Sequence, residues 1–175
     1  MIFVLDDFFD PSTMLPELRN ASSIDANVYG SDRAVDLRVR KTQKLGVSSE
    51  LRAAVHALLN DAQPRLAAHF DVTLDHFEEP QFLRYLPGDF FVAHQDGNTP
   101  VIYDDSRHRR ISIVLFVNAD YSGGALTLHG RYPDWERRDV VPSKPGSLIA
   151  FPSETTHEVT PVTAGERYTI VSWYR

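Results

Sequence analysis

Four polar side chains stand out because together they could hold a metal ion and an organic anion. His94 and Asp96 are two positions apart, His157 lies far downstream, and Arg167 follows His157 by ten positions. Two imidazoles and a carboxylate can occupy one face of a metal ion and leave other positions open for chemistry. A guanidinium stays charged in an apolar cavity, and its planar fork binds a carboxylate through two parallel hydrogen bonds. The sequence therefore predicts a metal centre with a carboxylate-binding arginine beside it.

The tripeptide His-x-Asp occurs twice, and only one copy has a predicted backbone that suits a shared metal. Residues i and i+2 of a β-strand point to the same face, so His94 and Asp96 project together if the apolar run at 90–92 continues as a strand. The other copy, His69 to Asp71, falls at the end of a predicted helix, where the two side chains diverge by about 200°. The tripeptide alone therefore decides little.

The C-terminal segment 151–173 gives the metal hypothesis its weight. Its pattern predicts a strand, a turn and a second strand, which could bring Arg167 alongside the pocket that holds His157. The alternatives are that His94 is an ordinary exposed or core histidine and that Arg167 forms a structural ion pair with one of the many carboxylates.

Composition narrows the class of protein. The 175 residues are 42% hydrophobic, which is enough for one substantial core and predicts a single domain spanning residues 1–175. A net charge of −6 with scattered basic residues argues against a nucleic-acid partner. The basic stretch 38–44 is interpreted as an exposed strand face. Because the chain has no cysteine, disulfides, thiolate nucleophiles and zinc–thiolate sites are excluded, and any metal must sit on nitrogen and oxygen ligands.

The chain shows no targeting or membrane signal. Its first residues lack a basic region and turn acidic after four apolar positions, which is unlike a signal peptide, and no apolar run has the length of a spanning helix. A cytoplasmic protein with no membrane partner is the expectation.

The predicted elements change character near residue 72. A short strand at 2–5 is followed by a helix opened by Pro11 and a second helix that starts at Ser48 or Ser49, with Pro64 expected to kink or split it. Helical support is thus expected mainly over 11–70, and a strand-rich core over about 72–175. Eight runs read as strands: 81–86, 89–95, 110–117, 124–129, 137–141, 146–151, 156–163 and 166–173. They favour a mainly β fold of two facing antiparallel sheets, of the jelly-roll or cupin kind, buttressed by the N-terminal helices. The longest irregular stretch, 97–109, directly follows Asp96.

Several of these features occur together, in the same order, in a known family. The chain resembles the prolyl 4-hydroxylase-like branch of the Fe(II)- and 2-oxoglutarate-dependent dioxygenases from about residue 36 to the C-terminus. The matching features are Tyr85 with Pro87-Gly88, His94-Gln95-Asp96, Ser122 to Leu126, Pro145 to Pro152, His157 to Pro161 and Arg167 to Trp173. The resemblance implies a double-stranded β-helix core. One departure is Phe116, where animal oxygen-sensing relatives have a tyrosine.

The resemblance also implies a role for each site residue. The metal ligands and catalytic residues would be His94, Asp96 and His157, and the metal would be Fe(II). Four residues would bind 2-oxoglutarate: Arg167 and Tyr85 at its distal carboxylate, and Leu126 and Trp173 along the pocket wall. The implied reaction consumes O2, converts 2-oxoglutarate into succinate and carbon dioxide, and hydroxylates an unactivated C–H bond, with ascorbate in support.

The substrate stays open at this stage. A prolyl residue of a peptide or protein would need an open groove, for which residues 27–40 and the loop 97–109 with Tyr103 are candidates. A free amino acid or other small metabolite would need a closing lid, which the same loop could supply. Two non-oxygenase alternatives are a cupin-like metal-binding or isomerase domain and a ligand-binding jelly roll, and neither accounts for the complete set of His, Asp, His and Arg.

Overall fold

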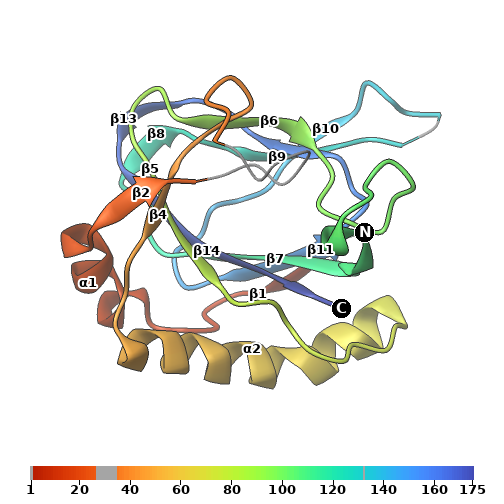
Figure 1. Ribbon diagram of the computed structural model, residues 1–175, viewed down its shortest axis with the longest axis horizontal. Coiled ribbons are helices and arrows are strands. Elements are labelled where there is room, and N and C mark those ends of the chain that lie inside the picture. The colour runs from red at the N-terminus through yellow and green to blue at the C-terminus, as the bar shows by residue number, and fades with distance from the viewer. Residues whose placement is uncertain (1, 27–34, 132) are drawn as a thin grey trace.

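Two antiparallel sheets face each other in the computed structural model, which describes residues 2–26, 35–131 and 133–175. The larger sheet has the order β1 (Phe3–Leu5), β11 (Leu148–Pro152), β7 (Ile111–Phe116), β14 (Arg167–Tyr174), β5 (Gln81–Tyr85), β4 (Gln43–Leu45) and β2 (Ser23–Asp25). The smaller sheet has the order β10 (Arg138–Val140), β9 (Leu126–His129), β12 (His157–Val159), β6 (Phe90–His94) and β3 (Arg40–Lys41). A short pair, β13 (Val162–Gly165) with β8 (Tyr121–Gly123), lies at one end (Figure 1).

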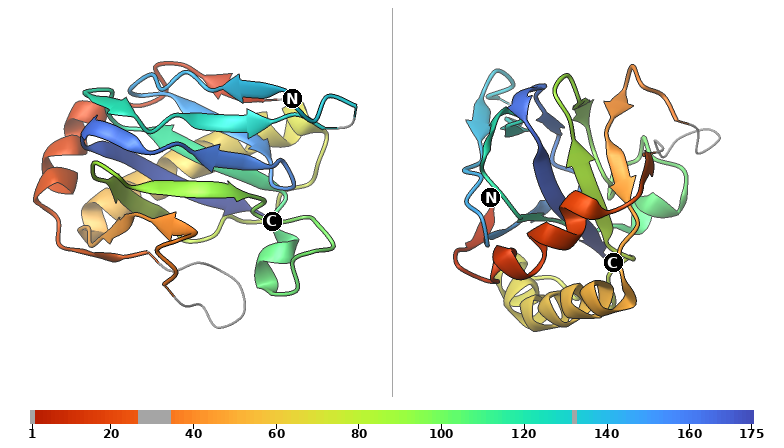
Figure 2. Two further views of the ribbon diagram at one scale, coloured as in Figure 1. Left: turned by 90° about the horizontal axis from the view of Figure 1, so that it is seen from above. Right: turned by 90° about the vertical axis from the view of Figure 1, so that its left-hand side faces the viewer.

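Helices cover the outer face of the larger sheet. The long helix α2 (Ser49–Phe70) runs beneath that sheet, and α1 (Leu15–Asn20) lies beside it after a 3-10 turn at Pro11–Thr13 (Figure 2). A second 3-10 turn covers Asp105–His108. The expected jelly-roll core with helical support on one sheet is confirmed. No helix in the described ranges combines the length and apolarity needed to cross a bilayer.

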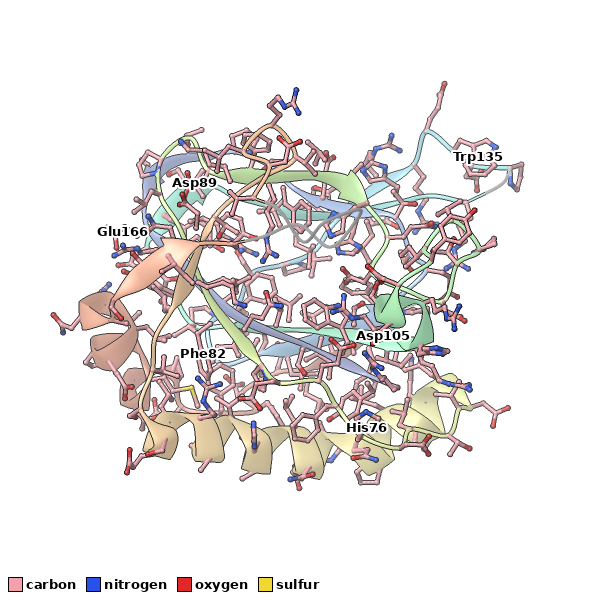
Figure 3. All side chains as sticks on the ribbon, in the orientation of Figure 1. His76, Phe82, Asp89, Asp105, Trp135 and Glu166 are labelled. Carbon is pink, nitrogen blue, oxygen red and sulfur yellow. The ribbon has the colours of Figure 1, made fainter. Side chains whose placement is uncertain are left out.

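The strand β7 shows why the fold has two apolar layers. Alternate side chains of a strand face opposite sides of the sheet. Ile113 and Leu115 therefore pack toward α2, while Val114 and Phe116 pack into the space between the two sheets. Side chains fill the outer layer between α2 and the larger sheet, where Phe82 is labelled in Figure 3. Burial on both faces explains why β7 is apolar at every position except Ser112.

The helix α2 begins as predicted but passes through its proline. The Ser48 hydroxyl accepts a hydrogen bond from the Leu51 N–H and caps the first turn. Of the two effects expected of Pro64, a kink or a split, the split does not occur, because α2 continues without interruption to Phe70. Pro64 and Asn60 are both exposed. The Asn60 carbonyl that loses its helical partner therefore faces water, which lowers the cost of the proline.

The strand predictions need two corrections. The run 156–163, predicted as one strand, is divided into β12 and β13 around Pro161, which has no N–H to continue the ladder. The short strands β2, β3, β4 and β8 were not predicted as separate strands, because two or three residues are too few to show an alternation. The N-terminal third therefore contributes strands as well as helices.

The basic stretch 38–44 is not simply an exposed strand face. Arg40 and Thr42 are 5% and 2% exposed and point inward, whereas the Arg38 side chain is 90% exposed. The interpretation failed because alternation along a strand shows that two faces differ, but it does not show which face is buried when both carry polar groups. Arg40 consequently reaches the space between the sheets.

Candidate active site

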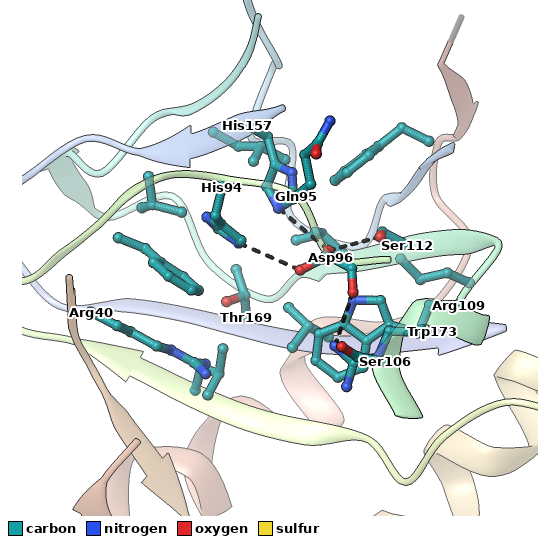
Figure 4. A pocket seen from close by; sticks show the side chains of 18 of the residues that line it. Arg40, His94, Gln95, Asp96, Ser106, Arg109, Ser112, His157, Thr169 and Trp173 are labelled. Carbon is teal, nitrogen blue, oxygen red and sulfur yellow. Dashed lines mark hydrogen bonds and ion pairs between the residues drawn. The ribbon is translucent and has the colours of Figure 1, made fainter. Parts of the chain in front are cut away.

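His94 and His157 are direct cross-strand partners on the smaller sheet. They stand opposite each other where β6 pairs with β12, so their side chains share one face, and their ring centroids are 4.2 Å apart. The Asp96 side chain joins them from beyond the end of β6. One ligand atom from each of these residues lies within 4.8 Å of the others. The structure therefore brings the three predicted metal ligands together (Figure 4).

Asp96 reaches this position by a different route from the one predicted. The strand β6 ends at His94, so the alternation of a strand does not extend to Asp96. Instead, the Asp96 and Gly97 N–H groups donate to the Ser153 carbonyl at 2.9 and 3.1 Å. This anchor on the segment after β11 turns the chain and keeps the carboxylate beside the two imidazoles.

The hydrogen bonds of the two histidines set which ring nitrogen faces Asp96. Nδ1 of His94 lies 2.8 Å from the Val92 carbonyl oxygen, and Nδ1 of His157 lies 2.9 Å from that of Thr155. Because a carbonyl only accepts, each Nδ1 carries the proton. Nε2 of each ring then faces an Asp96 oxygen at 3.4 Å. The hydrogen bonds of Nδ1 therefore leave Nε2 as the nitrogen that each ring offers to a metal.

Burial and charge fix the protonation states that a metal requires. Burial alone would raise the pKa of Asp96, but the neighbouring imidazoles and a hydrogen bond from Trp173 outweigh it and hold the carboxyl group far below its usual range. Burial, aided by His94, lowers the pKa of His157 to about 4. At neutral pH the site therefore offers a carboxylate and a neutral His157 imidazole, which are the forms that bind metals.

The other His-x-Asp copy lies on helix α2 as predicted. His69 belongs to the last turn, where its ring packs against Phe3 and Phe70, and Asp71 caps the helix in the left-handed conformation with a φ of 54°. Within the described ranges this copy is not part of a metal-binding cluster.

A cavity of about 580 Å³ extends from the three ligands between the two sheets. Its lining includes the four other predicted site residues: Tyr85, Leu126, Arg167 and Trp173. All four side chains are buried, with exposures between 1% and 7%. The predicted pocket therefore exists, and these residues line it.

Arg167 is a fully buried cation in this cavity. It lies opposite Tyr85 in the β14–β5 register, and its guanidinium carbon is 4.9 Å from the centre of the Tyr85 ring and 5.5 Å from that of Phe116. Nη1 donates to the Thr169 hydroxyl at 3.2 Å, while Nε has no hydrogen-bond partner. Among the described residues Arg167 makes no ion pair, so the structural salt bridge considered from sequence is not formed there. A buried charge in this state calls for an anionic ligand.

The loop 97–109 borders the cavity, as its position after Asp96 suggested. Val101 and Tyr103 line it although they are 68% and 87% exposed, so they lie at its mouth. Of the other proposed wall, residues 27–40, positions 27–34 lie outside the described residues, while Val39 and Arg40 line the cavity.

Sequence reasoning included Arg40 at the end of the proposed wall 27–40 but gave it no role of its own. Its guanidinium carbon lies 4.9 Å from the Phe91 ring centre, and Phe91 stacks on His94 at 3.6 Å (Figure 4). Arg109, the last residue of the proposed loop 97–109, was likewise given no role of its own: it stacks on Trp173 at 3.8 Å and pairs with Glu78. Neither arginine belongs to a motif, and only the fold shows that they face inward.

Comparisons with known proteins agree with this geometry. The model of the 2OG-Fe(II) oxygenase superfamily matches residues 80–175. A PKHD-type hydroxylase of Stenotrophomonas maltophilia (strain R551-3) is 31% identical over 140 residues, which cover 78% of this chain and 60% of that relative. A PKHD-type hydroxylase of Paracoccus denitrificans is 26% identical over 181 residues, covering 99% and 77%. The chain thus spans about 60% of the length of the first of these relatives.

Solved structures share the fold. A Pseudomonas putida prolyl-4-hydroxylase superposes with a TM-score of 0.74 at 21% identity, covering 99% of this chain and 91% of that one. A prolyl hydroxylase from Trichoplax adhaerens, solved with a hypoxia inducible factor peptide fragment, gives 0.73 at 20% identity, covering 99% and 82%. The family match covers the second half of the chain, from β5 to β14, including all seven predicted site residues. The chain belongs to the 2OG-Fe(II) oxygenase superfamily.

Proposed function

We propose that this protein is an Fe(II)- and 2-oxoglutarate-dependent dioxygenase that hydroxylates an unactivated C–H bond, with a prolyl residue of a peptide or protein as the favoured substrate. One observation carries the proposal. A convergent set of two imidazoles and a carboxylate shares a cavity with Arg167, a buried cation that makes no ion pair among the described residues. This combination suits a metal at one position and a dicarboxylate reaching from it to the arginine.

The donor set fits Fe(II). Two imidazole nitrogens and one carboxylate oxygen form the facial arrangement typical of non-haem iron oxygenases, and they leave positions open for other ligands. In this proposal His94, Asp96 and His157 bind the iron. Because Asp96 supplies a carboxylate where related halogenases have a small residue, hydroxylation is the proposed outcome.

The cavity fits 2-oxoglutarate at its other end. Arg167 would receive the distal carboxylate, and its unpartnered Nε and the neighbouring Thr169 hydroxyl support that role. Tyr85, beside Arg167 in the sheet register, would assist at the same carboxylate. Leu126 and Trp173 would form apolar walls along the co-substrate. Phe116 stands where animal oxygen-sensing relatives have a tyrosine, and its ring near Arg167 carries no hydroxyl, so fewer protein donors would reach the carboxylate.

The protein's own contribution is positioning and exclusion of water. Bound iron and 2-oxoglutarate supply the oxidising chemistry, with O2 as oxidant and ascorbate keeping iron reduced. His94 and His157 are held by backbone carbonyls, and Asp96 by the Ser153 carbonyl, and these contacts keep the ligand atoms converging on one point. The apolar walls between the sheets keep bulk water away from the reacting centre.

The cavity mouth favours an extended substrate. Val101 and Tyr103 expose large apolar surfaces there, where a peptide leaving the cavity could contact them. The prolyl hydroxylase from Trichoplax adhaerens, solved in complex with a peptide fragment, supports a peptide as the substrate for a protein of this fold. A free amino acid or other small metabolite is the alternative, with the loop 97–109 as a lid.

The activity is tested by succinate formation. Purified protein with Fe(II), ascorbate and 2-oxoglutarate should release succinate, and His94→Ala should abolish the release. His69→Ala is the matched control, because it removes the histidine of the other His-x-Asp tripeptide. The proposal fails if the wild type binds neither metal nor 2-oxoglutarate, or if turnover survives His94→Ala.

The substrate class is tested by mass spectrometry. Proline-containing peptides and free amino acids are incubated in parallel with the complete reaction, and products are screened for the mass of one added oxygen. Oxygen added to peptides but not to free amino acids supports the peptide assignment. The reverse result would establish the metabolite alternative instead.

A further inference from the structure

Two buried serines connect the metal-site carboxylate to the larger sheet. Ser112 lies on β7, where it pairs with Phe151 on β11 and Trp173 on β14. Ser153 follows β11 directly. Their exposures are 1% and 0%, so no bulk water competes for their hydroxyl groups. The Ser112 hydroxyl oxygen lies 2.7 Å from Asp96 Oδ2 and 3.0 Å from the Ser153 hydroxyl oxygen.

The direction of this hydrogen-bond chain follows from the chemistry of its end. The Ser112 hydroxyl is the donor to Asp96 Oδ2, because the oxygens of a carboxylate accept hydrogen bonds. Ser112 thereby uses its single hydroxyl proton. Its oxygen is then the acceptor for Ser153, and the Ser153 proton points toward Ser112. The order is Ser153 to Ser112 to Asp96, and polarisation along the chain makes Ser112 a stronger donor.

Ser153 also holds the main chain of the same carboxylate residue. Its carbonyl oxygen accepts the N–H groups of Asp96 and Gly97. One residue thus fixes the backbone of Asp96 directly and its side chain through Ser112. Because Asp96 lies beyond the end of β6, these contacts replace the strand pairing that would otherwise orient it.

We propose that Ser112 is a positioning residue that fixes the rotation of the Asp96 carboxylate, with Ser153 orienting the Ser112 hydroxyl. By engaging Oδ2, Ser112 leaves Oδ1 as the oxygen offered to the metal. The inference rests on the proposed function of the His94, Asp96 and His157 site. Partners of this kind around metal ligands set both affinity and geometry.

Binding of Co(II) alone tests the role of Ser112 without turnover. The affinity is measured by titration, and the visible d–d spectrum of bound Co(II) reports the coordination number. Ser112→Ala should weaken Co(II) binding by about 10- to 100-fold and change the spectrum. Ser147→Ala is the matched control: Ser147 is 1% exposed and donates to the Lys144 carbonyl, away from the site, and its variant should bind like the wild type.

A double-mutant cycle tests the order of the chain. Ser153→Ala keeps the carbonyl anchor and should weaken Co(II) binding by a smaller factor than Ser112→Ala. In the Ser112→Ala background the same change should have no further effect, because Ser153 acts through Ser112. If Ser153→Ala lowers the Co(II) affinity equally in both backgrounds, Ser153 does not act through Ser112 and the proposed order of the chain is wrong.

The possible failures can be told apart. If the wild type does not bind Co(II), the proposed function fails. If the wild type binds while Ser112→Ala binds equally well with an unchanged spectrum, the positioning role fails. Circular dichroism verifies folding, and if Ser112→Ala does not fold, Ser153→Ala decides: unchanged affinity and spectrum in that variant overturn the inference.

Discussion

The two His-x-Asp tripeptides show how much of a site comes from the backbone rather than from its letters. At the first, the helix end turns Asp71 into a cap and leaves His69 packed on phenylalanine rings. At the second, His94 ends a strand opposite His157, and Asp96 is anchored so that its carboxylate meets both imidazoles. The same residues are structural in one place and form the candidate metal site in the other.

The sharpest test of this contrast removes each histidine in turn. Mutating a hydrogen-bond partner of a metal ligand lowers activity by about 10- to 100-fold, and removing the ligand itself should lower it at least as much. His94→Ala should therefore lower the rate of succinate formation by more than about 100-fold. His69→Ala should leave the rate within about twofold, because surface and packing changes away from the site act mainly on stability. Comparable losses in both variants would erase the distinction between the tripeptides.

At the candidate site, substitutions of a metal ligand and of Arg167 should affect metal binding and 2-oxoglutarate binding differently. Asp96→Ala should weaken metal binding more than 2-oxoglutarate binding, because it removes a proposed ligand. Arg167→Ala should do the reverse, since it removes the buried cation, and a lost charged hydrogen-bond partner costs about 1.5–3 kcal/mol. Calorimetric titration of each variant with Mn(II) and with 2-oxoglutarate measures both. Equal losses of both ligands in each variant would indicate unfolding instead.

The position of the Arg167 side chain can be changed while its charge is kept. A Cβ on Gly124 would lie 2.9 Å from Arg167 Cδ and 2.8 Å from Val162 Cγ2. Gly124→Ala should therefore displace the guanidinium and lower kcat/KM for 2-oxoglutarate by about 10- to 100-fold. Gly88→Ala is the control, because it shares a positive φ but its Cβ would meet only Lys41 Nζ at 3.8 Å. If both variants lose the same activity, backbone strain explains the effect.

Near the second tripeptide, Glu78 forms ion pairs with Arg109 and Arg175, whereas within the described ranges His69 and Asp71 form none. Burial would raise the pKa of Glu78, but the guanidinium groups of Arg109 and Arg175 hold it below its ordinary value. Its contribution is therefore complete above the unfolded pKa near 4.5 and is lost as pH falls through the lower folded value. Glu78→Gln should reduce the unfolding free energy at neutral pH by about 1–3 kcal/mol.

The pH dependence of the melting temperature distinguishes the ion pair of Glu78 from the surface ion pair of Glu79. Glu78→Gln should flatten the fall of the melting temperature below pH 4.5, because the variant has no carboxylate to protonate. Glu79→Gln, at an exposed ion pair with Arg52, should change stability by less than about 1 kcal/mol. A larger effect at Glu79 would contradict the ranking.

The smallest expected effect concerns the first tripeptide again. Asp71 has a φ of 54°, a conformation that glycine adopts without steric cost. Asp71→Gly should change the free energy of unfolding by no more than about 1 kcal/mol and leave succinate formation unchanged. Chemical denaturation and the succinate assay measure the two quantities, and lost activity would mean that this region reaches the site.

The longer strands, the helix α2 and the grouping of the metal-site residues could be predicted from the sequence. Runs of β-forming residues bounded by Gly, Pro, Asp and Asn predicted β5, β6, β7 and β14, and the helical period predicted α2. The grouping of His94, Asp96 and His157 was also predictable. The reason for it was only half right: strand geometry ends at His94, and the Ser153 carbonyl completes the arrangement.

Other features could not be predicted, because they depend on contacts between distant segments. Arg40 is buried because β3 pairs with β6 at the sheet edge, a pairing of only two residues. Ser112 looks like one more polar residue in an apolar strand until the fold sets it beside Asp96. Short edge strands and single buried hydroxyl groups leave no periodic trace in a sequence.

The division of the site between the two sheets has a consequence for co-substrate choice. His94 and His157 belong to the smaller sheet, whereas Arg167 belongs to the larger one, and facing sheets keep a separation of about 10 Å. Under the proposed assignment, a ligand held at both ends must have the length that this separation sets. The packing of the two sheets would then act as a ruler, under which a 2-oxo diacid one methylene shorter or longer than 2-oxoglutarate fits poorly.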